Sequence, residues 1–206
     1  MKKTLFIFVA VAMSFFACTN GNNNTAVQNG DNNTDATETV TVDVPDDALV
    51  TDQSADGNQV LYLTYTEQDL AYNKENFDPE MPDVHNTLFL LDKKNGTTKM
   101  LMTMSDDLPG QCFSCDIQEA WFSKDGSRVF IINNPNTGTY FNALLYDLKA
   151  DKLIYLSDGD GIAEGDDGLY YVANAKGYNW EEGGAFWFTR IVDQEGNSLG
   201  GRDTIY

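Results

Sequence analysis

Short hydrophobic runs, rich in aromatic and β-branched side chains, are spaced along the chain between stretches that contain Asp, Asn or Gly. This pattern predicts β-strands joined by turns. No segment longer than about ten residues keeps a helical period, and the best helix candidate is residues 67–74, where Thr66 and Asp69 have the spacing of a capping box. The predicted strands include residues 59–65, 87–91, 128–132, 143–146, 169–172 and 185–192.

Two turn patterns alternate in strict order, and each occurs three times. The first is Asp-Gly before a hydrophobic strand, and the second is a strand that ends in Asp, followed by a polar turn and another strand. Asp-Gly and Asn-Gly supply the positive φ angles that tight hairpins need. The chain therefore predicts an all-β fold in which an antiparallel, four-stranded unit is repeated about three times, over residues 46–105, 117–157 and 158–206. The Asp-Gly turns are Asp56-Gly57, Asp125-Gly126 and Asp167-Gly168, and the second pattern starts at Asp92, Asp147 and Asp193.

The middle unit carries a resemblance to a known family. Residues 121–130, Trp-Phe-Ser-Lys-Asp-Gly-Ser-Arg-Val-Phe, resemble the strand-turn-strand signature of TolB-type and WD40-like β-propeller blades, with Lys124 where that family usually has proline. Residues 145–154 resemble the hairpin that follows, with Ala150 and Asp151 in place of a glycine turn. The resemblance is good over residues 117–157 and degenerate elsewhere. It implies a β-propeller-like fold and no particular activity, because propellers host unrelated functions.

Three units are fewer than the four to eight blades of a closed propeller. The units could form a six-bladed ring with a second copy, as a homodimer, or an open stack covered by inserted segments, or their strands could pair differently. We expect a propeller-like antiparallel domain and leave its closure open. Two segments, residues 67–86 and 105–116, interrupt the repeat, and such insertions either cover an exposed edge or carry function.

The N-terminus predicts export. Lys2 and Lys3 precede an apolar run over residues 5–16, which is shorter than the roughly 20 residues of a membrane-spanning helix and has the length of a signal peptide. The run ends in Ala17-Cys18, which resembles the lipobox of bacterial lipoproteins, where cleavage leaves the cysteine as a lipidated N-terminus. An ordinary signal peptide with an incidental cysteine is the alternative.

Residues 18–45 follow as a segment crowded with Asn, Thr and Gly. Such a composition has almost nothing to bury, so we expect a disordered tether from lipidated Cys18 to a domain over residues 46–206. The segment is similar to the spacers of Bacteroidetes-type lipoproteins. The resemblance implies a protein anchored by lipid to the cell envelope, at the outer membrane, on its periplasmic or its surface face.

The net charge of the chain limits the kinds of partner that it can bind. The 206 residues include 13 Lys and Arg but 32 Asp and Glu, which gives a formal net charge of −19. A chain this acidic repels phosphate backbones, so we exclude nucleic acid as a partner. One histidine and three cysteines exclude most His-dependent catalysis and a dense disulfide scaffold.

Cys112 and Cys115 are close enough in sequence for a small disulfide, which an oxidising compartment favours. Redox activity, a zinc site and unpaired thiols stay open. The segment after Cys115 predicts a strand, whereas a redox cysteine usually stands at a helix N-terminus. A zinc site would need two more ligands, and His85 is the only histidine.

A group of glycine-spaced acids begins like a calcium loop but has Ile162 where a ligand is needed, so the EF-hand pattern fails. Solvated turns are the main interpretation, and Ca²⁺ is a weak alternative. The acids concerned are Asp158, Asp160, Glu164 and Asp166.

Aromatic side chains offer a second binding hypothesis. Tyr178 and Trp180 fall in a predicted loop and are candidates for ligand binding, whereas Trp121 and Trp187 fall inside strands, where we expect them in the core. No serine has the context of a nucleophile–base pair, so no catalytic residue is assigned. We expect a non-catalytic module, without a cofactor, that binds an envelope protein or another ligand. The alternative is an envelope enzyme or carbohydrate-binding protein that uses surface carboxylates and aromatics.

Overall fold

The structure is a computed structural model that describes residues 43–77, 84–105, 108–109, 115–135, 141–179 and 184–203. All of these residues belong to one compact unit, residues 39–206. The predicted signal peptide, the lipidation site Cys18 and most of the tether lie outside the described residues. Within them, no helix is long and apolar enough to cross a membrane.

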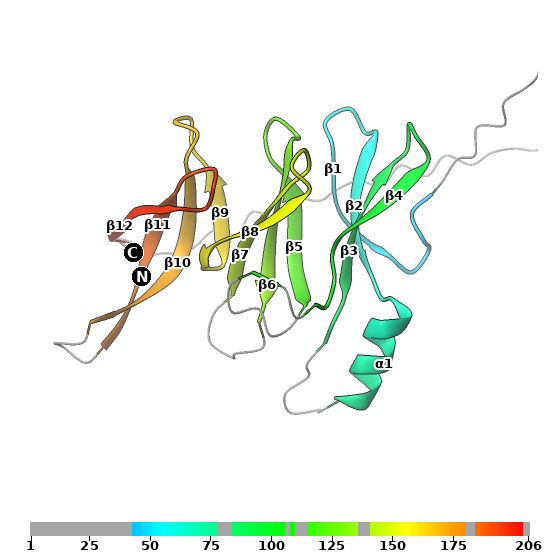
Figure 1. Ribbon diagram of the computed structural model, residues 1–206, viewed down its shortest axis with the longest axis horizontal. Coiled ribbons are helices and arrows are strands. Elements are labelled where there is room, and N and C mark those ends of the chain that lie inside the picture. The colour runs from blue at the N-terminus through cyan, green and yellow to red at the C-terminus, as the bar shows by residue number, and fades with distance from the viewer. Residues whose placement is uncertain are drawn as a thin grey trace, which may run out of the picture. The chain divides into compact units, whose positions relative to one another are not determined.

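The described residues form three four-stranded antiparallel sheets, each a meander in which consecutive strands are neighbours (Figure 1). Sheet 1 contains β1 (Leu49–Gln53), β2 (Gln59–Thr64), β3 (Thr87–Asp92) and β4 (Thr97–Met102). Sheet 2 contains β5 (Asp116–Phe122), β6 (Arg128–Asn134), β7 (Asn142–Asp147) and β8 (Lys152–Asp158). Sheet 3 contains β9 (Gly161–Glu164), β10 (Tyr170–Asn179), β11 (Gly184–Val192) and β12 (Ser198–Asp203).

This architecture confirms the predicted all-β, propeller-like fold of about three four-stranded units, because a four-stranded antiparallel sheet is the blade of a propeller. The described residues form three separate sheets and no closed ring. The Asp-Gly turns occupy equivalent places, each between the first two strands of a sheet, and their glycines Gly57, Gly126 and Gly168 have φ of 70°, 69° and 75°. In the turn between β7 and β8, Asp151 takes the positive φ that Gly96 and Gly196 have in the equivalent turns of the other two sheets.

Sheet 2 is buried on both faces, which explains why its hydrophobic runs are continuous rather than alternating. Side chains alternate between the faces along β6, so Val129 and Ile131 pack against sheet 1 while Phe130 and Ile132 pack against sheet 3. The first cluster also contains Leu61 of sheet 1, and the core therefore lies in the two spaces between successive sheets.

The opposite face of sheet 1 is covered by the chain that leads into β1. Val60 and Leu91 on this face are only 1% and 0% exposed, because Val44 and Ala48 pack over them. The face is therefore already closed by the protein's own chain.

The helix α1 (Glu67–Glu75) follows β2 and lies at the end of sheet 1 that is opposite to the β1–β2 turn (Figure 1). The predicted capping box is present, since Thr66 accepts a hydrogen bond from the Asp69 amide and Asp69 accepts one from the Thr66 amide. Asp69 is fully buried and its Oδ2 also accepts a 2.6 Å hydrogen bond from Thr87 at the start of β3. The cap that begins the helix therefore also attaches it to the sheet.

Asn86 joins sheets 1 and 2. Its side chain accepts a 2.9 Å hydrogen bond from the Ile117 amide and donates a 3.0 Å hydrogen bond to the Ile117 carbonyl, as a neighbouring strand would. Its own amide donates to the carbonyl of Cys115 at 2.8 Å. The end of the first inserted segment therefore fixes the start of β5.

Candidate functional site

The first two Asp-Gly turns are built by the same local hydrogen bonds. In the first turn, the Ser54 amide donates to the Gln59 carbonyl and the Gly57 amide donates to the Ser54 carbonyl. In the second turn, Ser123 has the place of Ser54 and Gly126 that of Gly57, with the same two bonds. Each Asp carboxylate accepts hydrogen bonds from its own turn, which stabilises the turn as an Asx-type structure.

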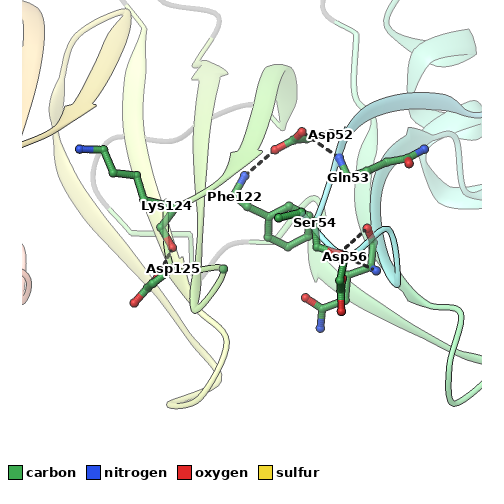
Figure 2. Close-up of a pocket in the computed structure, with 11 residues that line it drawn as sticks. Asp52, Gln53, Ser54, Asp56, Phe122, Lys124 and Asp125 are labelled. Atoms are coloured by element: carbon green, nitrogen blue, oxygen red, sulfur yellow. Dashed lines mark hydrogen bonds between the residues drawn. The ribbon is translucent and has the colours of Figure 1, made fainter.

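A hollow of about 460 Å³ lies between the first turn and the second. We call it the turn hollow. Asp52 and the first turn form one wall, while Phe122 and the second turn form the other (Figure 2). Its lining is Asp52, Gln53, Ser54, Ala55, Asp56, Gln59, Phe122, Ser123, Lys124, Asp125 and Gly126.

Asp52 holds the two walls together. Its Oδ2 accepts a 2.9 Å hydrogen bond from the Phe122 amide, and its Oδ1 accepts a 2.8 Å bond from the Gln53 amide. The last residues of β1 and β5 are thereby fixed side by side, and the Phe122 ring stands between Asp56 and Asp125 in the view of Figure 2.

Two carboxylates of the hollow, those of Asp56 and Asp125, are ionised at neutral pH and stay ionised well below it. Hydrogen bonds from Ser54 and Asn58 lower the pKa of Asp56 to about 2, and hydrogen bonds from Ser123 and Ser127 lower the pKa of Asp125 to about 2. Donors that bond the charged form of a carboxyl favour it. The hollow therefore carries fixed negative charge.

Lys124 does not neutralise that charge, because its ammonium group is used elsewhere. Its Nζ donates to the Glu164 carbonyl and to Asp166, both at 3.3 Å, and its amide donates to Glu164 at 3.0 Å. Figure 2 shows the side chain extending away from Phe122 and Ser54. Lys124 thus joins the second turn to sheet 3.

A comparison of the repeats explains why the turn hollow is open. Ala55 in the first turn has the sequence position that Lys124 has in the second, between the serine and the Asp-Gly pair. A lysine at this position reaches the next sheet, whereas a methyl group leaves the space between the turns unfilled. At the junction between units two and three, Arg128 also donates to Tyr170 and Gln194, so the two junctions differ at more than one position.

A second hollow of about 390 Å³ continues along the same two strands. We call it the strand hollow. It is mainly apolar, and two of its side chains are well exposed, Leu49 at 64% and Val50 at 43%. Its lining is Leu49, Val50, Thr51, Gln118, Glu119, Ala120 and Trp121.

The predicted cysteine site is only half described. Cys115 is fully buried directly before β5, and Cys112 lies outside the described residues. The disulfide between them stays a prediction.

Each acidic candidate for Ca²⁺ has a bonding partner within the protein. Asp158 accepts from the Lys176 amide at 2.7 Å, and Asp160 accepts from the Asn174 side chain at 2.8 Å. Glu164 and Asp166 contact Lys124. Among the described residues, no group of three or more His, Cys, Asp or Glu side chains is placed to hold a metal ion.

The aromatic candidates have mixed outcomes. Trp180 and the side chain of Tyr178 lie outside what the structure describes, so their role in binding stays a prediction. Trp121 is half-buried and packs on Phe130, with ring centroids 5.6 Å apart. The prediction that Trp187 belongs to the core is wrong, since it is 41% exposed. Alternation along β11 places it on the face opposite to Val192, which packs against sheet 2.

Sequence reasoning missed the two hollows. It treated Asp56 and Asp125 only as turn residues, and they are turn residues, but the hollow forms between their turns. The available signal was the difference between Ala55 and Lys124 at equivalent positions of the two turns.

No known family profile matches this chain, and no curated protein matches it. Solved structures similar to it include the β-propeller domain of the Trilobed protease from Pyrococcus furiosus, at 12% identity and a TM-score of 0.47 over 77% of this chain and 44% of that one. An acylaminoacyl peptidase from Pyrococcus horikoshii is 13% identical, with a TM-score of 0.44 over 76% of this chain and 25% of that one. A TolB from Agrobacterium tumefaciens is 12% identical, with a TM-score of 0.39 over 79% of this chain and 53% of that one. The chain thus spans about half of these chains or less.

Proposed function

We propose that this protein is an envelope lipoprotein, anchored through Cys18, that acts as a non-catalytic binding module for another envelope protein. The contact surface is the turn hollow and the strand hollow between sheets 1 and 2. One observation carries the proposal: the junction between the first two units keeps an open, charged hollow, while the equivalent junction between units two and three is bridged by Lys124.

The electrostatics of the turn hollow favour binding over catalysis. A general acid or base works best when its pKa lies near the working pH. With pKa values of about 2, Asp56 and Asp125 are deprotonated and weakly basic at neutral pH. Their fixed charge suits recognition of a partner.

The anchoring half of the proposal is tested by labelling. Cells that produce the chain are fed a radiolabelled fatty acid, and the wild type is compared with Cys18→Ala. We expect label and membrane association in the wild type only. Equal label in the variant contradicts the lipid anchor.

The binding half is tested by crosslinking the whole chain in intact envelopes and identifying the crosslinked protein. Ala55→Trp fills the turn hollow and is expected to abolish the crosslink. Thr98→Trp places the same side chain at an exposed position of β4 and serves as the matched control. Equal crosslinking by both variants refutes the assigned surface. Turnover of chromogenic glycosides, lost on substitution of one carboxylate, would favour the enzymatic alternative.

A further inference from the structure

The turn hollow and the strand hollow are lined by adjacent residues of β1 and of β5. On β1, Thr51 lines the strand hollow and Asp52 lines the turn hollow. On β5, Trp121 lines the strand hollow and Phe122 the turn hollow. We call the two together the β1–β5 groove.

The two ends of this groove have different chemistry. One end exposes Leu49 and Val50, which are apolar and gain by being covered. The other end carries the carboxylates of Asp52, Asp56 and Asp125. An occupant that suits both ends is apolar at one end and positively charged at the other.

The carboxylates retain capacity for a cationic group. A carboxylate has about four lone-pair positions. In Asp52 each oxygen accepts one hydrogen bond from a backbone amide. The cation nearest to them along the chain, Lys124, is turned toward sheet 3. The positive charge of Arg128 offsets the charge of Asp125 in part. A guanidinium or ammonium group in the turn hollow would still meet the other carboxylates and, in Phe122, an aromatic ring that also attracts cations.

The backbone favours an extended occupant. β1 pairs only with β2, and β5 pairs only with β6, so both strands are the first, edge strands of their sheets. No strand in the described part of the chain pairs with their outer edges. On β5, the backbone groups of Ile117 are bonded by Asn86. The Phe122 amide is bonded by Asp52, so a peptide would pair with the part of the edge between these residues. Edge strands bind extended peptides through backbone hydrogen bonds, while pockets select alternate side chains.

We propose that the β1–β5 groove binds an extended segment of a partner protein in which an apolar side chain is followed within a few residues by Lys or Arg. The apolar side chain covers Leu49 and Val50, and the cation enters the turn hollow. This inference rests on the proposed binding function and names the chemistry of the partner.

The test measures fluorescence anisotropy with the whole chain in detergent and three labelled ten-residue peptides as probes. The first has Leu and Val followed by Arg and Lys, the second has Gln in place of Arg and Lys, and the third has Ser in place of Leu and Val. We expect only the first to bind well, and its affinity to fall as salt is raised, because exposed ion pairs are screened.

Asp56→Asn with Asp125→Asn removes two charges but keeps an oxygen in each turn to accept the turn's hydrogen bonds. We expect this double variant to bind the first peptide about five- to tenfold more weakly, which corresponds to about 0.5 to 0.7 kcal/mol for each of two exposed pairs. Asp167→Asn makes the same change in the third turn, outside the groove, and serves as the matched control. Thermal unfolding followed by circular dichroism checks that all variants fold.

Three results overturn the inference: the glutamine peptide binds as well as the basic one, Asp167→Asn weakens binding as much as the double variant does, or no peptide binds. The crosslinking experiment separates this failure from a failure of the proposed function. If the double variant still crosslinks the same envelope protein as the wild type, the binding function stands and the groove's assigned chemistry is wrong. If the wild type crosslinks nothing, the binding function itself fails.

Discussion

The junction between sheets 1 and 2 depends on Asn86, and this dependence gives a strong prediction. Asn86 is 9% exposed and Ile117 is 2% exposed, so the hydrogen bonds between them are shielded from water. Asn86→Ala removes the acceptor of the Ile117 amide and the donor to the Ile117 carbonyl together. Two buried backbone groups then lack their partners.

The loss of folding free energy in Asn86→Ala follows from the two backbone groups that lose their partners. Leaving one buried polar group unsatisfied costs about 1 to 3 kcal/mol, so two groups cost about 2 to 6 kcal/mol. The bond from the Asn86 amide to the Cys115 carbonyl is retained, because it uses the backbone. Domains have total stabilities of about 5 to 15 kcal/mol, so the variant should fold but should be much weakened.

Urea unfolding, followed by tryptophan fluorescence, measures the effect. With a slope of about 2 kcal/mol per molar urea, the midpoint should fall by about 1 to 3 M. Asn58→Ala is the matched control, since Asn58 is exposed and its side chain bonds only the adjacent Asp56 in the first turn. Asn86→Ala within about 0.5 kcal/mol of this control would refute the reasoning, because surface substitutions have effects of that size.

Three further predictions concern the turns and the helix. Gly126 has φ of 69° and open space around an added Cβ, so Gly126→Ala should lose about 1 to 2 kcal/mol in urea unfolding through backbone strain alone, and an unchanged midpoint would contradict this. The folded pKa of Asp56 and of Asp125 lies near 2, below the ordinary 3.8, so the stability they contribute is complete above about pH 4 and is lost as the pH falls through about 2. Between these pH values the urea midpoint of Asp125→Asn should change less than the midpoint of the wild type. An equal change in both proteins would contradict the lowered pKa of Asp125. Asp69→Ala removes the Asp69 half of the capping box of α1 and the bond to Thr87, so amide exchange over residues 67–75 should accelerate while sheet 2 stays protected; uniform acceleration would show that the helix is not a separate unit.

Local signals sufficed for the repeated parts of the fold. The Asp-Gly turns and the capping box of Thr66 and Asp69 are decided by neighbours in sequence, because their hydrogen bonds close over a few residues. The strands of sheet 2 were predictable for a similar reason, since continuous β-branched and aromatic runs bounded by turns favour buried strands.

Long-range contacts were not predictable from these signals. Asn86 stands 31 residues before Ile117, and nothing around either residue indicates that a side chain will complete a backbone pair there. The prediction that Trp187 is buried was wrong for a related reason. A strand pattern indicates which residues share a face of the sheet, but not which of the two faces the next sheet covers.

Predicting the β1–β5 groove requires both the local turn signals and the contacts between units. Repetition places equivalent turns at equivalent ends of successive sheets, so any difference between two junctions must come from the few positions where the repeats diverge. At one such position the second unit has Lys124, which reaches Glu164 and Asp166, and the first has Ala55, which reaches nothing beyond its own turn. The acids themselves do not distinguish the turns, because Asp56, Asp125 and Asp167 all serve turn formation. The proposed binding site therefore depends on the space beside the acids, where the first unit has a small residue and its counterpart in the second unit is long and charged.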